Sequence, residues 1–250
     1  MLEFRDVTFK YDEDELPMMT NLSFTVNDGE FISVIGASGC GKSTLFRLIN
    51  GLEKPQSGEI LVNGISIRKQ KNYSSFMPQK DLLLPWKTIE QNVCLPMEIM
   101  GVPKEKQRIA CEDALRQAGL LEYINKYPKD LSGGMKQRAA FARTLLTGAD
   151  MLMLDEPFSA LDYLTRVDMQ EWLLKQWGNS EKTIIFITHD VEEAVFLSKK
   201  IFVIQDRPFS KMECIEVPMG YPRDRADLKR PDVADLKEQL ISKLRKKDEK

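Results

Sequence analysis

The sequence is poor in residues that bind transition metals. It has a single histidine, His189, and four cysteines that lie far apart, with no CxxC pair: Cys40, Cys94, Cys111 and Cys214. A structural zinc site needs four closely spaced Cys and His ligands, so this composition excludes zinc fingers and ribbons. We expect the cysteines to be reduced thiols of a cytosolic protein.

Long apolar runs and an excess of charge are also missing. The longest apolar stretches, such as TIIFIT, have the length of a strand and fall well short of the roughly 18 residues that suggest a membrane span. The N-terminal MLEFRDVTFKYDEDE is charged throughout and lacks the apolar stretch of a signal peptide. A formal net charge of −2 provides no general attraction to nucleic acid. We therefore expect a soluble protein without a nucleic-acid partner, which reaches a membrane only through another protein.

Apolar periodicity predicts an α/β fold. Alternating apolar and polar residues predict half-buried strands over 2–9 and 22–26, and SGEILVNGISI (57–67) predicts a hairpin that turns at Asn63-Gly64. Continuous apolar runs are typical of buried parallel strands. Such runs occur at FISVI (31–35), MLML (151–154), TIIFI (183–187) and KIFVI (200–204).

Strand signals vanish between Asp81 and Gly148, where helical segments are separated by proline and glycine. Strands that alternate with helices, interrupted by one all-helical stretch, indicate a parallel-sheet core with an inserted helical subdomain. We expect three parts: a core at 1–80 and 149–205, the helical insertion at 81–148 and a C-terminal tail at 206–250. Apolar residues at helical spacing predict a helix over 232–247 in this tail, before it frays into KKDEK: Val233, Leu236, Leu240 and Leu244.

A phosphate-binding loop is the clearest motif. GASGCGKS matches GxxxxGK[ST] between a predicted strand and a predicted helix over 43–50, the context that gives this pattern its meaning. Its glycines let backbone N–H groups turn toward phosphates, Lys42 supplies a cation for the β- and γ-phosphates, and the Ser43 hydroxyl can bind Mg²⁺. Cys40 could act as a nucleophile, but no second histidine or resolving cysteine is available, so we interpret it as a small residue whose backbone matters. The predicted nucleotide-binding residues of the loop are Gly36, Ala37, Ser38, Gly39, Cys40, Gly41, Lys42, Ser43 and Thr44.

MLMLDEP supplies the acids that a nucleotide site requires. Asp155 follows a predicted buried strand at its carboxyl end, where ligands of parallel sheets collect, and there it can hold Mg²⁺. Glu156 can polarise an attacking water. The alternative interpretation is a pair of acids that caps a helix after the strand.

Three further polar residues fit the same site. A lone histidine is usually structural, but His189 follows a buried strand, as do Lys42 and Asp155, and this convergence favours a functional role. Gln79 follows the predicted strand YSSFM, where its amide could reach Mg²⁺ or the attacking water. Tyr11 could stack on a base, or it could be an exposed strand aromatic.

In this order, the segments resemble the ATP-binding subunit of an ATP-binding-cassette (ABC) transporter over roughly residues 1–205. The resemblance implies a P-loop NTPase (RecA-like) parallel-sheet core with an N-terminal antiparallel β-subdomain and an inserted all-helical signature subdomain. It also implies the roles of the residues: Tyr11 as the adenine-stacking aromatic, 36–44 as Walker A, Gln79 as the Q-loop, 151–156 as Walker B, Ser159 and Asp162 in the D-loop (SALD, 159–162), and His189 as the switch histidine.

The resemblance also explains a second glycine-rich helix start, LSGGMKQR (131–138). Unpaired N–H groups at a helix start favour an anion, although the chain already has a phosphate loop. In the family two subunits pack head to tail, and the signature loop of one covers the γ-phosphate bound by the other. The resemblance therefore implies a homodimer in which these signature residues serve the partner's ATP: Ser132, Gly133, Gly134 and Gln137.

Within the family, three segments resemble the nitrate/sulfonate/taurine branch of bacterial importers: MPQKDLLLPWKTIEQNV, the methionine after the two glycines, and IQDRPF (204–209). Lys80 departs from this branch, which usually has an acid there. The branch implies import of a small anionic solute at the cytoplasmic face of the cell membrane, with transmembrane permease subunits and an extracytoplasmic solute-binding protein.

The apolar cluster LLLPW after Gln79 is the expected permease contact, through Leu83, Leu84 and Trp86. The leucines could instead pack the core of the helical subdomain, whereas Trp86, beside a proline, suits an interface anchor. In the resembling family this region forms a groove for a short permease helix.

Two other classes of function remain as alternatives. Soluble ABC ATPases of translation or DNA repair carry two cassettes or a long coiled coil, and this chain has one cassette, no sustained heptads and no basic stripe. A regulatory module without turnover would have no chemical need for Glu156 and His189. An importer subunit for a different solute is also compatible with the sequence.

Overall fold

The computed structural model describes residues 1–180 and 182–245, which form two compact units. Unit 1 consists of residues 1–73 together with the chain from 177 onward, and unit 2 consists of residues 74–176. The boundaries expected at 80 and 148 both lie inside unit 2, because the strands that flank the helical segment cluster with it. The C-terminal tail belongs to unit 1.

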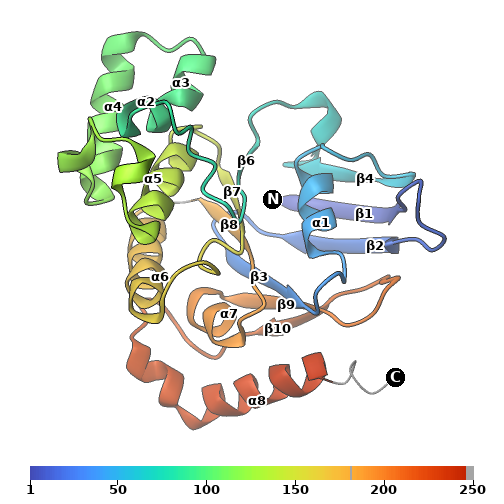
Figure 1. Cartoon of the computed structure of the whole chain (residues 1–250). Coiled ribbons are helices and arrows are strands. Elements are labelled where there is room, and N and C mark those ends of the chain that lie inside the picture. Colours follow the sequence, from blue (N-terminus) through green and yellow to red (C-terminus); the bar gives the residue numbers. More distant parts are fainter. Residues whose placement is uncertain (181, 246–250) are drawn as a thin grey trace. The chain divides into compact units, whose positions relative to one another are not determined.

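Unit 1 begins with an antiparallel sheet in the order β2-β1-β4-β5 (Figure 1). β1 alternates buried and exposed residues, and its pairing with β2 and β4 is interrupted near Asp6, which has a φ of 48°. The predicted hairpin at Asn63-Gly64 is confirmed, since β4 and β5 pair on either side of it. The strands are β1 (Leu2–Phe9), β2 (Met19–Val26), β4 (Ser57–Val62) and β5 (Ile65–Ser66).

Unit 1 also holds strands in the order β10-β9-β3-β8, of which β9, β3 and β8 are parallel. β3 and β8 are buried along their whole length, as their continuous apolar runs predict. β10 pairs antiparallel with β9 and was not foreseen from the sequence. These elements are β3 (Phe31–Gly36), α1 (Lys42–Ile49), β8 (Thr183–Ile187), α7 (Val191–Leu197), β9 (Lys200–Ile204), β10 (Glu213–Glu216) and α8 (Pro231–Arg245).

The tail helix predicted over 232–247 is confirmed as α8 for the residues that the structure describes. Its apolar face is buried through Val233, Leu236 and Leu240. Residues 246 and 247, together with the rest of KKDEK, lie outside the described residues.

Unit 2 contains the parallel pair β6–β7 and the helical segment. The residues between Asp81 and Gly148 form helices and contain no strand in the described structure, as predicted. The elements are β6 (Ser74–Met77), α2 (Ile89–Val93), α3 (Leu95–Ile99), α4 (Lys104–Gln117), α5 (Gly133–Leu145), β7 (Met151–Asp155) and α6 (Tyr163–Gly178), whose last residues belong to unit 1.

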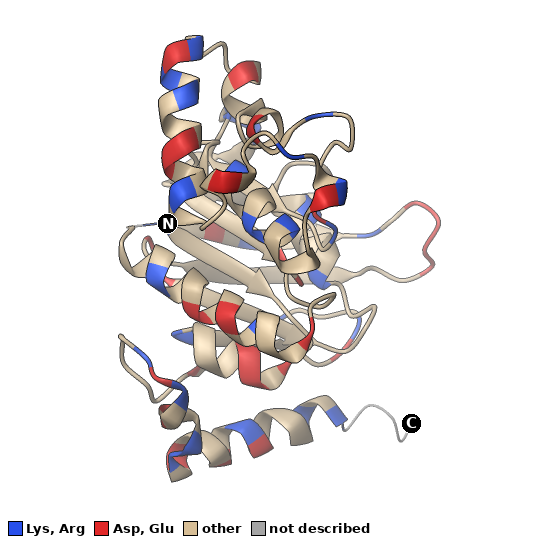
Figure 2. Cartoon of the chain, turned by 60° about the vertical axis from the view of Figure 1, so that its left-hand side comes forward, with Lys and Arg blue, Asp and Glu red and all other residues tan. Residues whose placement is uncertain are grey.

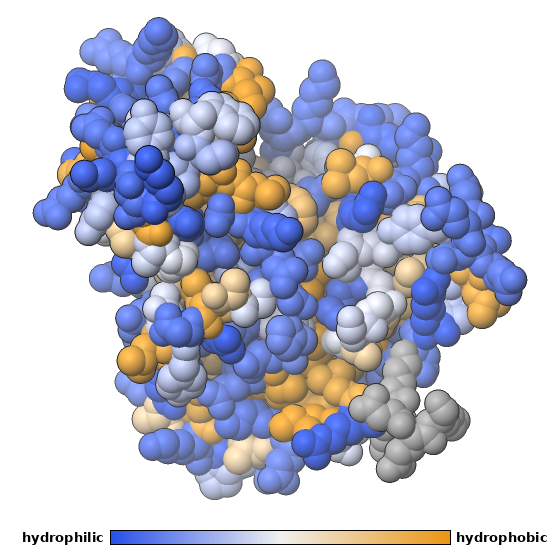
Figure 3. Space-filling view, viewed as in Figure 1, coloured by the Kyte–Doolittle hydropathy of each residue, from blue (hydrophilic) through white to orange (hydrophobic). Residues whose placement is uncertain are grey.

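The helices are mixed in charge (Figure 2), and the face drawn in Figure 3 is mostly hydrophilic. Lys and Arg residues are interspersed with Asp and Glu residues along the helices (Figure 2). Hydrophilic side chains dominate the face drawn in Figure 3, and apolar side chains lie there in separate groups. Within the described residues, no helix has both the length and the apolar character needed to cross a bilayer.

Candidate functional site

The phosphate loop of unit 1 joins the end of β3 to the start of α1. Gly39 and Gly41 have φ values of 74° and 113°, in the left-handed region that glycine adopts without strain. At Gly36, an added Cβ would lie 2.6 Å from the Cys40 sulfur and 2.8 Å from the Ile204 carbonyl oxygen. Glycine is therefore required at these positions by backbone conformation and by packing. Cys40, interpreted from the sequence as a small residue whose backbone matters, is buried.

Lys42 lies inside this loop. Its Nζ donates to the carbonyl oxygens of Gly36 (2.8 Å) and Ala37 (2.9 Å), and the residue is only 8% exposed. The N-cap of α1 is Gly41, so no capping side chain occupies the N–H groups of the first turn. A phosphate bound at this helix start would meet backbone N–H groups, the helix dipole and the Lys42 ammonium together.

The aromatic residue expected at the base site lies beside the loop. The Tyr11 hydroxyl is 3.2 Å from Thr44 Oγ1 in α1, and its ring packs edge-on against Phe9. Two residues that the sequence analysis missed, Met18 and Phe209, pack against the loop at Gly41. An added Cβ at Gly41 would lie 2.9 Å from Met18 Sδ and 3.0 Å from Phe209 Cε1. No local pattern could have revealed this contact, because it joins three distant parts of the sequence.

His189 follows β8, which runs parallel to β3 with Val34 opposite Ile187. The segments that follow β3 and β8 therefore leave the sheet at the same edge, as predicted from the strand ends. The neighbours of His189 are both tied to α7. Asp190 caps the helix by accepting from the N–H groups of Glu192 (2.8 Å) and Glu193 (3.1 Å), and the Thr188 hydroxyl donates to Glu193 Oε2 (2.6 Å).

In unit 2 the structure brings three predicted residues together. Gln79 Nε2 donates to Ser159 Oγ (3.0 Å) and to Glu156 Oε2 (3.4 Å), and the Ser159 hydroxyl donates to the Glu156 carbonyl oxygen (3.0 Å). Glu156 follows directly after Asp155, the last residue of β7, and has a φ of 45°. The Q-loop amide, the candidate water-activating carboxylate and the D-loop serine thus form one hydrogen-bonded group.

The signature loop leads into α5, which begins at Gly133. Ser132 is its N-cap, and the Ser132 hydroxyl oxygen accepts from the Met135 N–H (3.3 Å). The two glycines differ. At Gly134 an added Cβ would lie 2.4 Å from Thr165 Cγ2, whereas at Gly133 the nearest atom, Leu161 Cδ2, would be at 3.7 Å. Packing within the chain therefore explains Gly134 and leaves Gly133 without an explanation in the described residues.

Gln137 is placed differently from the other signature residues. It is 4% exposed, and its Nε2 donates to the Gln79 carbonyl oxygen (3.4 Å). Its Oε1 is buried without a hydrogen-bond partner among the described residues. From this position Gln137 holds the backbone of the Q-loop at Gln79. A direct contact of Gln137 with a partner's ATP stays a prediction.

Arg143, a residue that the sequence analysis missed, holds the same loop. Its guanidinium donates to the carbonyl oxygens of Asp81 (2.6 Å) and Leu82 (2.8 Å), and burial lowers its pKa. Arg143 and Gln137 both belong to α5, so this helix is bonded to the Q-loop at Gln79, Asp81 and Leu82. The six-residue spacing between Gln137 and Arg143 is visible in the sequence, but nothing in the sequence shows that both bind the backbone of the Q-loop.

Comparisons with known proteins identify the family. A family model described as ABC transporter matches residues 19–159, more than half of the chain. The chain belongs to this family. The formylaminopyrimidine import ATP-binding protein ThiZ of Halalkalibacterium halodurans is 40% identical over 247 residues, which cover 98% of this chain and 94% of that protein. The aliphatic sulfonates import ATP-binding protein SsuB of Bacillus cereus is 38% identical over 217 residues, which cover 87% of this chain and 85% of that protein.

A solved structure agrees with this assignment. A dimeric ATP-binding cassette in a post-hydrolysis state, bound to ADP and Pi, is 28% identical and has a TM-score of 0.75, covering 88% of this chain and 100% of that one. The chain is thus an ATP-hydrolysing ABC cassette with the P-loop NTPase fold, and the predicted fold class and enzyme class are confirmed.

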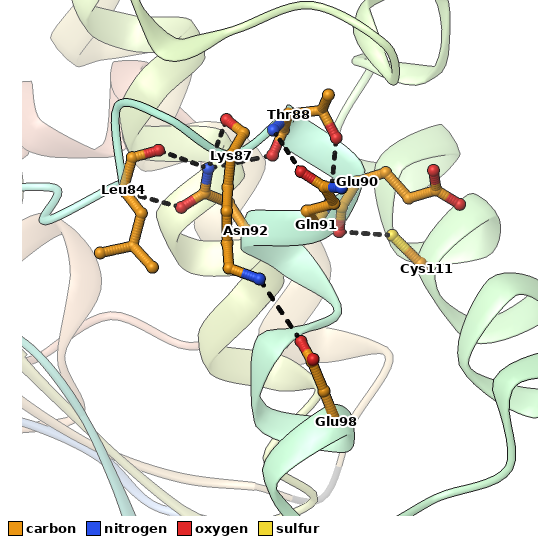
Figure 4. Close-up of polar contacts among 8 residues, drawn as sticks. All are labelled: Leu84, Lys87, Thr88, Glu90, Gln91, Asn92, Glu98 and Cys111. Carbon is orange, nitrogen blue, oxygen red and sulfur yellow. Dashed lines mark hydrogen bonds and ion pairs between the residues drawn. The ribbon is translucent and has the colours of Figure 1, made fainter.

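In this ABC cassette the segment after the Q-loop is ordered by one buried side chain, Asn92 (Figure 4). Its Oδ1 accepts from the Leu84 N–H (2.6 Å), and its Nδ2 donates to the carbonyl oxygens of Leu84 (3.1 Å), Lys87 (3.1 Å) and Thr88 (2.9 Å). Asn92 satisfies the backbone of a turn that no secondary structure covers. A buried asparagine on an otherwise apolar helix face is the only sequence signal for it.

This turn presents some of the predicted permease contacts and hides another. Trp86 is 71% exposed and Leu84 is half-buried, whereas Leu83 is only 8% exposed. Leu82, which belongs to the predicted LLLPW cluster but not to its three expected contacts, is 58% exposed. The burial of Leu83 agrees with the alternative that a leucine of this cluster packs in the protein's own interior.

Asp162 of the D-loop has a local structural role in the cassette. Asp162 directly precedes α6, and its Oδ1 accepts from the N–H of Thr165 in the first turn of that helix (3.1 Å). Hydrogen bonds from the Thr165 side chain and backbone lower the pKa of Asp162. These hydrogen bonds favour the charged form of Asp162, which caps the start of α6.

Proposed function

We propose that this cassette powers a bacterial import permease at the cytoplasmic face of the membrane, as one of two identical subunits that share two ATP sites. The observation that carries the proposal is the signature helix start. Ser132 caps it, and packing among the described residues gives Gly133 no reason to be glycine, so this helix start is suited to receive a phosphate from outside the chain. Both relatives described above are import ATP-binding proteins, and the structure described above is a dimer.

The roles of the residues follow from their chemistry. The Walker A N–H groups and Lys42 would hold the β- and γ-phosphates, and Tyr11 would stack on the adenine. Glu156 would orient or deprotonate the attacking water, with its carboxylate steadied by Gln79. His189 would contact the γ-phosphate from the end of β8.

Mg²⁺ fits the oxygen donors that the chain offers. Ser43, Asp155 and Gln79 carry the hard oxygen donors that Mg²⁺ prefers, and Mg²⁺ is usually held by one or two carboxylates together with substrate phosphates. When bound, the ion neutralises charge that develops on the phosphates. Within the described residues, no group of three or more His, Cys, Asp or Glu side chains could hold a metal.

The permease would bind the exposed part of the turn that Asn92 orders. Trp86, Leu82 and Leu84 offer apolar side chains there, and an exposed tryptophan on a fixed backbone suits a central anchor. We propose a small anionic solute of the nitrate/sulfonate/taurine type, delivered by an extracytoplasmic binding protein, which the sulfonate relative supports. The formylaminopyrimidine relative supports a second candidate, a small nitrogen heterocycle.

Glu156→Gln tests the proposed ATPase chemistry. The amide keeps the size of the side chain but cannot take a proton, so turnover should fall by at least about 10²-fold while ATP binding is retained. The variant should accumulate as an ATP-bound dimer on size exclusion. Glu122→Gln, an exposed glutamate in the helical segment of unit 2, is the matched control and should behave as wild type. Normal turnover in Glu156→Gln would contradict the assigned role.

A further inference from the structure

The C-terminal segment of unit 1 packs against α7, the helix that follows His189, and forms hydrogen bonds with it. We call residues 217–245 the brace. The brace contacts both ends of α7, and the functional assignments above give it no task. In Figure 1 its helix α8 (red) lies next to α7 (orange), and the two helices pack together.

At the C-terminal end of α7, the brace binds carbonyl oxygens that a helix leaves without intrahelical partners. Arg223 Nη1 donates to the carbonyl oxygens of Val195 (2.9 Å), Phe196 (2.9 Å) and Ser198 (3.0 Å). The Tyr221 hydroxyl donates to the remaining one, Leu197 (2.7 Å). A half-buried guanidinium at this end also complements the negative pole of the helix dipole.

The brace fixes this guanidinium from its own side. Arg223 Nη2 and Nε donate to the carbonyl oxygens of Met219 (3.0 Å) and Gly220 (3.2 Å), and the guanidinium carbon lies 4.1 Å from the centre of the Tyr221 ring. Tyr221 in turn packs against Trp177, with ring centroids 4.7 Å apart. Arg223 is therefore a rigid link between the brace and α7.

At the N-terminal end of α7, the contact is ionic. Lys237 Nζ lies 3.3 Å and Arg225 Nη1 lies 4.0 Å from the carboxylate of Glu192. Glu192 is one of the two residues whose N–H groups Asp190 caps. Arg225 also stacks on the Phe196 ring at 4.3 Å.

Both neighbours of His189 are hydrogen-bonded to α7. The Thr188 hydroxyl donates to the buried carboxylate of Glu193, and Asp190 is the N-cap, while the Thr188 N–H also donates to the Val34 carbonyl oxygen of β3 (3.4 Å). The short helix has seven residues and is anchored at both ends by the brace. A shift of α7 would therefore act on His189 through both of its neighbours.

We propose that Arg223 and Tyr221 are positioning residues for hydrolysis, which hold α7 so that His189 meets the γ-phosphate. The inference rests on the proposed role of His189. A brace that only stabilised the fold would lower the amount of active protein, whereas a positioning brace lowers the rate per bound nucleotide.

Arg223→Lys in the full-length chain separates these roles. Lysine keeps the charge but cannot present the guanidinium fork to several carbonyls. We expect kcat to fall about tenfold with KM and the stoichiometry of ATP binding unchanged, because misplacing a catalytic group costs rate more than binding. Arg230→Lys is the matched control, since Arg230 is an exposed residue of the same segment that pairs with Asp232. It should leave kcat unchanged.

A double-mutant cycle makes the test decisive. In a His189→Ala background, Arg223→Lys should change kcat by less than about twofold, because its effect acts through the missing side chain. An equal loss in both backgrounds, or a kcat of Arg223→Lys equal to wild type, would overturn the inference. Tyr221→Phe, which removes only the bond to Leu197, should show the same dependence on His189 with a smaller loss and serves if Arg223→Lys does not fold. Wild-type turnover of His189→Ala alone would instead remove the proposed role of His189, and the inference with it.

Discussion

The two glycine-rich helix starts of this cassette are built differently. In unit 1, Gly39 and Gly41 have positive φ, and Met18 and Phe209 crowd the backbone at Gly41. In unit 2, the φ values of Gly133 and Gly134 are not positive, and Ser132 closes the first turn as an ordinary N-cap. One loop is wound so that its backbone can surround a phosphate, and the other is a regular helix end.

The difference affects what each helix start can offer a bound phosphate. A wound loop that also contains Lys42 can bind a phosphate alone, since it supplies N–H groups and a cation together. The capped start of α5 has Ser132 and two glycines before its first basic residue, Lys136, so it offers mainly the helix dipole and a few donors, which suit a phosphate already bound elsewhere. This contrast supports the proposed division of work between two subunits.

The largest loss of turnover should come from a substitution in the phosphate loop of unit 1, which can bind a phosphate without a partner. In Lys42→Ala the cation for the β- and γ-phosphates is lost, so ATP binding should be severely weakened and turnover should fall by at least about 10²-fold. The measurements are nucleotide affinity by fluorescence titration and phosphate release. Lys54→Ala, an exposed lysine after α1, is the control and should match wild type.

Mixing variants tests whether the second loop serves a partner. Ser132→Arg should place bulk and charge at the signature helix start, so turnover should be lost although the monomer still binds ATP. An equal mixture of Ser132→Arg and Lys42→Ala chains should restore up to roughly a quarter of wild-type turnover, because in a mixed dimer one site carries both defects and the other none. A mixture as inactive as its components, under conditions where dimers exchange, would contradict the composite site.

Much of the site could be predicted because its signals are local. β3, the glycines and Lys42 occupy one continuous stretch, and buried strands place Asp155 and His189 at strand ends. The hairpin at Asn63-Gly64 and helix α8 were predictable for the same reason, because turn residues and apolar spacing are read within a few residues.

The remainder depends on contacts between distant residues, which leave no period in the sequence. Phe209 packs on Gly41, Arg223 binds the end of α7, and Arg143 binds the Q-loop backbone. β10 was missed because its four residues, ECIE, are short and half charged, and only pairing with β9 makes them a strand. Leu83 and Leu84 are adjacent leucines, and only the fold separates the buried one from the half-buried one.

A pair of alanine variants sharpens the contrast inside the signature loop. Gly133→Ala meets only ordinary contacts, so the fold should be kept, while a methyl group at the helix start should lower turnover about tenfold by displacing the partner's phosphate. Gly134→Ala would place its Cβ 2.4 Å from Thr165, so the free energy of unfolding should fall by about 1–3 kcal/mol. Urea unfolding and phosphate release distinguish the two. The contrast fails if Gly133→Ala is as active as wild type, or if Gly134→Ala is fully stable.

The smallest effect should come from the cap itself. Ser132→Ala removes the acceptor for the Met135 N–H, which should lower the free energy of unfolding by about 1 kcal/mol, and Ser132→Thr should recover most of this loss because threonine also caps helices. If the hydroxyl also serves a partner's ATP, turnover of Ser132→Ala should fall a further few-fold under conditions where the chain is fully folded.

Thr88→Ala is the matched control, since the Thr88 hydroxyl oxygen caps α2 by accepting from the Gln91 N–H at the same distance, 3.3 Å. It should lose similar stability in urea, yet keep the turnover of the isolated chain. Equal turnover losses in Ser132→Ala and Thr88→Ala would reduce Ser132 to a structural cap and leave Gly133 as the residue that distinguishes the second loop.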